Sequence, residues 1–178
     1  MITATEFWTQ QPFHQIVTYS FNRGPKLAAP HNAADQVLAE LATLPPTDHL
    51  RRFKLKRQLR ELQAEKEIGA TQRRLFNAQG TLDSTAEQIA AIEQNSVPAE
   101  QLSQLFQRAG GEVVYAMCLP VFRDALVFND AQGRLLRVLH VCFECLYMEA
   151  SDKLNVEADI LFYSQLRGLL TQLGHPIT

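Results

Sequence analysis

Two neighbouring segments, residues 113–128 and 135–147, constrain the fold most strongly, because both are rich in valine, leucine, phenylalanine and tyrosine. These residue types favour the extended backbone of a β-strand. The six residues that separate the segments, Asn-Asp-Ala-Gln-Gly-Arg, are typical of a turn. The pattern therefore predicts a β-hairpin in the last third of the chain.

Other segments complete a sheet and its cover. Residues 13–21 crowd aromatic and β-branched side chains mostly onto one face, which predicts a half-buried strand. Residues 156–173 carry leucines at helical spacing, and Gly174 stands where a C-terminal cap is expected. Because neither hairpin nor helix can bury its apolar side alone, we predict an α+β fold. Its mixed or antiparallel sheet is built on the C-terminal hairpin and flanked by helices.

The middle of the chain gives weaker patterns. Residues 33–44 have helical spacing and are followed by two prolines, which predicts a helix. Residues 51–62 fit parts of both periods and are interpreted as an extended strand. A helix is expected from Ala64 onward, with Ile68, Leu75 and Phe76 on one side.

Two short helices are predicted further on, at residues 84–94 and 98–109. The first has few apolar residues, whereas the second has a clear apolar stripe and a proline in its first turn. Residues 81–110 are therefore interpreted as a helical surface insertion in a single domain that spans residues 1–178.

Composition excludes several functional classes. The chain has 178 residues, 46% of them hydrophobic, which is enough for one sizeable core. A net charge of -2 gives no overall reason to bind nucleic acid or an acidic membrane. The basic run at residues 51–60 is interpreted as a solvated face balanced by nearby glutamates, with phosphate contact as the alternative. Without a leader-like or membrane-spanning segment, we expect a cytoplasmic protein, or an exported one if a signal peptide has been removed.

The hairpin register decides which polar side chains meet. If residues 130–133 form the loop, Asn129 faces Arg134, and the same register places Cys118 opposite Cys145. One face then collects the core residues Cys118, Phe122, Leu126, Phe128, Leu139, Val141, Phe143 and Cys145. The other face carries a polar patch of Arg123, His140, Cys142 and Glu144.

This polar patch has two interpretations. His140 beside Arg123 and Glu144 has the composition of a general base with an orienting carboxylate. The interpretation that we favour is a satisfied polar patch on a sheet face, without a catalytic role. The sequence has neither a nucleophile elbow nor a glycine-rich phosphate loop, so it gives no support for a hydrolase or a nucleotide-binding enzyme.

The three cysteines also leave alternatives open. Cys142 and Cys145 are expected to point to opposite faces of a continuous strand, which disfavours a zinc site made by these two residues with Cys118 and His140. Buried thiols are favoured over both zinc and thiol-redox use. We expect Cys118 and Cys145 to be close, reduced in a cytoplasmic protein and bridged in an exported one, with Cys142 as the lone thiol.

The last third of the chain resembles a family of uncharacterised bacterial proteins that end in a hairpin followed by a helix. The matching features are an Arg, a short apolar run, an Asp-x-x-Gly turn, a Cys-Phe-x-Cys strand and a helix that ends in Leu-Gly. In this chain they are Arg123, residues 125–128, 130–133 and 142–145, and Leu173-Gly174. Two departures are Asp124, where such proteins often have His, and residues 81–110. The resemblance implies no activity, and it implies export for many members.

The sequence therefore favours a non-enzymatic bacterial binding protein, either an immunity-type inhibitor or an accessory protein, with a protein partner and no cofactor. The alternative is a metal-binding or thiol-redox protein that uses the Cys-Phe-Glu-Cys strand, for which zinc is the expected metal.

Overall fold

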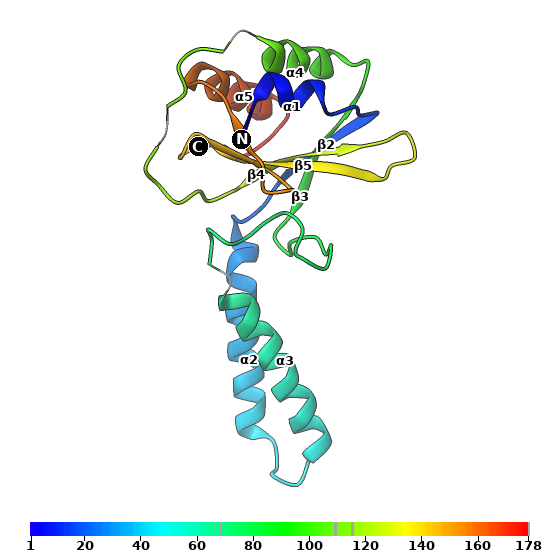
Figure 1. Ribbon diagram of the computed structural model, residues 1–178. Coiled ribbons are helices and arrows are strands. Elements are labelled where there is room, and N and C mark those ends of the chain that lie inside the picture. Colours follow the sequence, from blue (N-terminus) through cyan, green and yellow to red (C-terminus); the bar gives the residue numbers. More distant parts are fainter. Residues whose placement is uncertain (68, 109, 115, 178) are drawn as a thin grey trace.

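Seven strands join into one sheet in the computed structural model, which describes residues 1–67, 69–108, 110–114 and 116–177, with the backbone alone for residues 28–31 and 65–67 (Figure 1). Across the sheet the strands are β1 (Ile2–Thr3), β7 (Asn155–Glu157), β6 (Tyr147–Ala150), β5 (Leu135–Cys142), β4 (Asp124–Asn129), β2 (Gln15–Ser20) and β3 (Glu87–Glu93). Only β1 and β7 are parallel, and all other neighbouring strands are antiparallel. The mixed sheet and its flanking helices confirm the α+β prediction.

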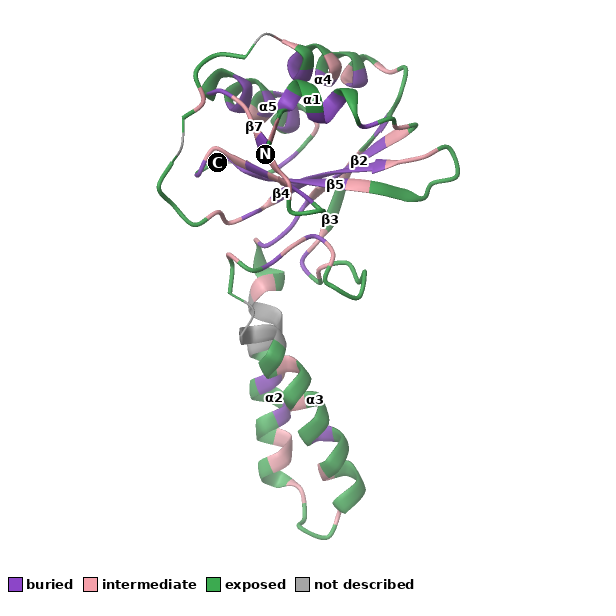
Figure 2. Cartoon of the chain, in the orientation of Figure 1, coloured by how far each residue is buried: buried purple, intermediate pink, exposed green. Residues whose placement is uncertain are grey.

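Three helices cover one face of this sheet: α1 (Ala4–Thr9), α4 (Val97–Gln107) and α5 (Ile160–Gln172) (Figure 1). Their buried side chains pack with those of the strands into the larger hydrophobic cluster (Figure 2). Its large members include Phe7, Trp8, Leu102, Phe106, Leu126, Phe128, Leu139, Val141, Phe143, Phe162, Leu166 and Leu169. The helix expected to close the chain is confirmed, although it begins later than predicted because residues 155–157 form β7.

An irregular segment, residues 69–86, supplies the cover of the opposite face. A smaller cluster lies there: Val17, Phe21, Leu75, Phe122, Ala125, Val127, Val138, Cys142 and Cys145. A buried ion pair between Arg73 and Asp83, 2.9 Å apart, ties the segment together. The helix expected from Ala64 through Leu75 and Phe76 is therefore wrong from Gly69 on, since Leu75 reaches the sheet from irregular backbone; Ile68 lies outside the described residues.

The hairpin of β4 and β5 is confirmed, but it is shorter than predicted, because the described residues of 113–123 and residues 143–146 are outside its strands. Its predicted register is also wrong by two residues. Ala125, not Arg123, pairs with His140. The loop takes one more residue than expected, since Asn129 pairs with Leu135, and a bulge between Phe128 and Asn129 adds the second shift.

Because strand side chains alternate, an even shift keeps each β4 and β5 residue on its predicted face. Leu126 and Leu139 accordingly share the helix-covered face. Two residues are corrections. Phe122 precedes β4 and packs in the smaller cluster on the opposite face, and Cys118 is exposed on irregular backbone and not on the core face.

Two helices, α2 (Ala29–Thr43) and α3 (His49–Glu67), project from the sheet domain as an antiparallel pair that we call the arm (Figure 1). A single 3-10 turn, η1 (Pro25–Ala28), leads into the arm.

The helix expected at residues 33–44 is confirmed within α2, whereas the strand interpretation of residues 51–62 is wrong. Leu55, Leu59 and Leu62 recur every four and three residues, so they turn to one side of α3, whereas the exposed Phe53 breaks this pattern and misled the sequence interpretation.

Residues 81–110 also differ from expectation. The helix predicted at residues 84–94 is wrong, because β3 occupies that region and pairs with β2 at the sheet edge. A bulge in this pairing interrupts the alternation of side chains along β3. Ile89 and Ile92 on this strand are three residues apart, a spacing that also fits a helix. The following helix is confirmed as α4, with Ala109 outside the described residues. This region therefore contributes an edge strand and a core helix to the sheet domain.

Candidate functional site

The structure brings together three of the four residues of the predicted polar patch. The Arg123 guanidinium forms an ion pair with the Glu144 carboxylate. The Cys142 thiol donates a weak hydrogen bond to the other carboxylate oxygen of Glu144, with 3.6 Å between Sγ and Oε2. Both charged side chains are partly exposed, so this ion pair is worth little to stability.

His140 has a different role. Its Nε2 accepts the backbone N–H of Leu75 at 3.2 Å, and its Nδ1 lies 3.3 Å from the carbonyl oxygen of Glu149, the arrangement of a neutral ring that donates from Nδ1. Burial, reinforced by the nearby positive charge of Arg74, lowers the pKa of His140 to about 4. His140 therefore joins the irregular cover to the sheet through backbone groups, and Glu144 is not its orienting carboxylate.

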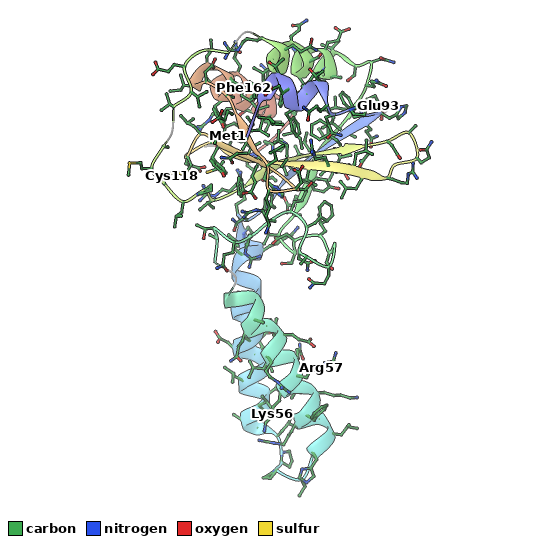
Figure 3. All side chains as sticks on the ribbon, viewed as in Figure 1. Met1, Lys56, Arg57, Glu93, Cys118 and Phe162 are labelled. Atoms are coloured by element: carbon green, nitrogen blue, oxygen red, sulfur yellow. A yellow bond between two sulfur atoms is a disulfide. The ribbon has the colours of Figure 1, made fainter. Side chains whose placement is uncertain are left out.

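The cysteines are arranged differently from the sequence expectation. The expected closeness of Cys118 and Cys145 is confirmed. Of the two expected states, reduced or bridged, the structure has the bridged one: a disulfide with Cα atoms 5.9 Å apart. Cys118 reaches this position from an irregular segment at the side of the sheet domain (Figure 3), not from a paired strand. The expectation that Cys142 and Cys145 point to opposite faces is wrong, because β5 ends at Cys142 and the chain turns, which puts both residues in the smaller cluster.

This arrangement bears on the predicted metal and redox chemistry. The disulfide occupies two of the four proposed ligands, and the described residues contain no convergent group of three or more His, Cys, Asp or Glu side chains. Cys142 is the free thiol, and burial raises its pKa. A thiol nucleophile needs a lowered pKa, so this position favours a packed cysteine.

The sequence interpretation missed a buried network at the C-terminal end of the chain. Asp124 binds His175 Nδ1 at 2.7 Å and the Arg23 guanidinium at 2.5 Å. Arg23 also donates to the carbonyl oxygen of Pro176 at 2.6 Å. Gly174, with a φ of 102°, turns the chain after α5 and so brings His175 onto the sheet.

The only available signal for this network was Asp124, which departs from the pattern of the resembling family. The arrangement is that of an acid-histidine pair, but the side chains of His175 and Asp124 are 0% and 1% exposed. No substrate reaches the ring, so the network anchors the C-terminus. A cavity of about 360 Å³ beside it is lined by Arg23, Arg123, Asp124 and Glu144, whose charges already pair with one another.

The arm provides the most distinctive exposed surface. Its helix α3 carries six basic residues and no acidic one between residues 51 and 60. Arg52 donates to the carbonyl oxygens of Leu41 and Leu44 at 3.2 and 3.0 Å, and so closes the end of α2. Arg51 forms an ion pair with Glu40 at 2.6 Å. Two of the six basic residues therefore hold the arm together.

The remaining four basic residues, Lys54, Lys56, Arg57 and Arg60, are exposed. Figure 3 shows Lys56 and Arg57 on the arm, well away from the sheet. Leu50 and Phe53 lie on the same helix and are 68% and 63% exposed. The outer face of α3 thus combines positive charge with two large apolar side chains that contribute nothing to the core.

Comparison with known proteins adds no relative: no family model, curated protein or solved structure matches the chain. The resemblance to the bacterial family therefore stays a prediction. Among the described residues, no helix combines the length and the apolar character needed to cross a membrane.

Proposed function

We propose that this chain is a non-enzymatic binding protein that contacts a protein partner through its arm. The observation that carries the proposal is the exposure of Leu50 and Phe53 within a basic face that projects from the sheet domain. Large apolar side chains in an exposed, contiguous patch commonly mark an interaction surface.

The construction of the arm supports this role. Its helices α2 and α3 contact each other, and α2 also contacts η1, but neither helix contacts any other described helix or strand. Folding of the sheet domain therefore does not require the outer face of α3. A two-helix projection costs conformational entropy without adding to the main core, which supports a contact with another protein as its role.

Two kinds of binding protein fit this description. An immunity-type inhibitor covers the active or binding site of another protein, whereas an accessory protein holds its partner in place. Both use a rigid, exposed element, and neither needs a catalytic set. The polar groups of the sheet domain are consistent with this class, because His140, Asp124 and His175 are used in internal hydrogen bonds.

Photo-crosslinking tests the proposal. A photoreactive amino acid at Phe53 of the full chain is expected to give a reproducible protein adduct in lysate of the source cells, competed by excess unmodified chain. The matched control places the same residue at Leu135, which is 50% exposed on β5. Equal adducts from both positions, or none from position 53, would reject the arm as the contact surface.

A further inference from the structure

We infer that the arm binds an acidic amphipathic helix of its partner, laid along the outer face of α3. This inference rests on the proposed function and specifies the chemistry of the partner. It depends on two features of α3: the positive charge that the described side chains only partly neutralise, and the position of the two exposed apolar side chains.

The positive charge of this face is only partly neutralised by the chain itself. Arg57 pairs with Glu61 at 2.9 Å, but both side chains are mostly exposed, so this pair exchanges readily with a partner carboxylate. Lys54 and Lys56 have no ion-pair partner among the side chains that the structure describes. A ligand with a row of carboxylates therefore gains contacts that the free protein lacks.

The two exposed apolar side chains are spaced so that they lie on the same face of α3. Leu50, Phe53 and Arg57 follow one another at intervals of three and four residues, so they form one stripe along the helix. Residues 50–60 rise by about 15 Å, or roughly three turns. A partner helix of similar length can place apolar residues against Leu50 and Phe53 and carboxylates against the flanking lysines.

Nucleic acid fits this face less well. A phosphate backbone has no apolar surface to set against Leu50 and Phe53, which lie among the basic residues of α3, whereas an amphipathic helix has one. The net charge of the chain, -2, adds no long-range attraction for a polyanion.

A membrane surface also fits poorly. Binding in the plane of a bilayer needs a broad apolar face along the helix. The apolar face of α3 is instead turned toward α2, with Leu55 only 8% exposed, and two residues remain outside. The observations therefore favour a protein ligand.

Titration of the full chain with three defined probes tests the inference. The probes are a synthetic amphipathic helix made of Glu, Ala and Leu, vesicles that contain phosphatidylserine, and single-stranded polyuridine. We expect the acidic peptide to bind in a salt-dependent way. The double variant Lys54→Glu, Arg57→Glu should raise its Kd roughly tenfold, and Phe53→Ala should raise it roughly fivefold.

The matched control is the double variant Arg134→Glu, Lys153→Glu, which makes the same change in net charge at two exposed turns of the sheet domain. It should leave the Kd within about twofold. Failure of the peptide to bind, equal weakening by the control, or tighter binding of vesicles or polyuridine would each overturn the inference. If position 53 still crosslinks to a protein after such a result, the proposed function stands and only the acidic helix is rejected.

Discussion

The sheet domain and the arm represent two ways of using a helix. In the sheet domain, α1, α4 and α5 each bury an apolar side against strands, and Phe7, Phe106 and Leu166 are at most 1% exposed. In the arm, the buried side chains among those described are Ala34, Val37 and Leu55. The large difference in buried apolar area means that the sheet domain provides most of the free energy of folding.

The difference also separates stability from binding. A residue in the sheet domain is constrained by packing on several sides, whereas a residue on the outer face of α3 is constrained only by helix formation. Substitutions should therefore divide into two classes: those that change the free energy of unfolding and those that change partner affinity. Four predictions test this division, in order of decreasing effect.

The largest effect is expected from Phe128→Ala. The Phe128 ring is fully buried and lies 5.6 to 6.2 Å from the rings of Phe7, Phe13 and Trp8. Removing it should lower the free energy of unfolding by about 3–5 kcal/mol in urea denaturation. The control Phe53→Ala should change it by less than about 0.5 kcal/mol. Similar losses for both variants would contradict the division.

A somewhat smaller effect is expected from Cys118→Ala. The disulfide joins residues 27 apart in sequence, and loss of such a loop constraint costs roughly 3 kcal/mol in the unfolded-chain model. The exposed neighbour variant Met117→Ala is the control. Thiol titration of the denatured protein should give one free thiol; a count of three would show that the bridge is absent from the protein in solution.

A pH-dependent effect is expected from His140. Because its folded-state pKa of about 4 lies below the ordinary value of 6.5, the unfolded chain takes up a proton first as the pH falls. The stability that neutral His140 allows is therefore complete above pH 6.5 and is lost as the pH falls toward 4, with a size on the order of 3 kcal/mol. His140→Gln should flatten the measured stability in this range. If the free energy of unfolding of the variant depends on pH as that of the original protein does, His140 is not the cause of the pH dependence.

The smallest effect is expected from Leu55→Ala in the arm. Leu55 is buried against α2, but the arm contacts no other described helix or strand apart from η1. The free energy of global unfolding should therefore fall by less than about 1 kcal/mol, while amide hydrogen exchange in α2 and α3 becomes faster. A loss above about 2 kcal/mol, with slower or unchanged exchange in the arm, would mean that arm and sheet domain unfold together.

Segments whose side-chain period agreed with their final environment could be predicted from the sequence. The helices α4 and α5 each bury one face, and their apolar residues recur at helical spacing. β2 and much of the β4–β5 hairpin are buried on both faces, and their β-branched and aromatic residues favour strands. The strand β3 and the helix α3 could not, because a bulge altered the period of the first and the exposed Phe53 obscured that of the second. In both cases the local pattern reflected something other than a single buried face.

For the candidate site, the sequence identified the basic run and the residues of the polar patch, but not their roles. His140 became a link to the backbone of Leu75, from a segment 65 residues away in the chain. Arg51 and Arg52 bind groups at the end of the α2 segment, and these contacts form only because α2 packs alongside α3. Such roles depend on which groups meet, and one chain segment does not contain that information.

By itself, the sequence determined the α+β class, the hairpin and the closing helix, because residue periods and turn residues act locally. Tertiary structure decided the two-residue register shift, the hydrogen bond between Asp124 and His175, and the projection of α3 from the sheet domain. The physical reason is that each of these features depends on contacts between distant segments, where bulges, buried charges and the choice of packing partner outweigh local preference.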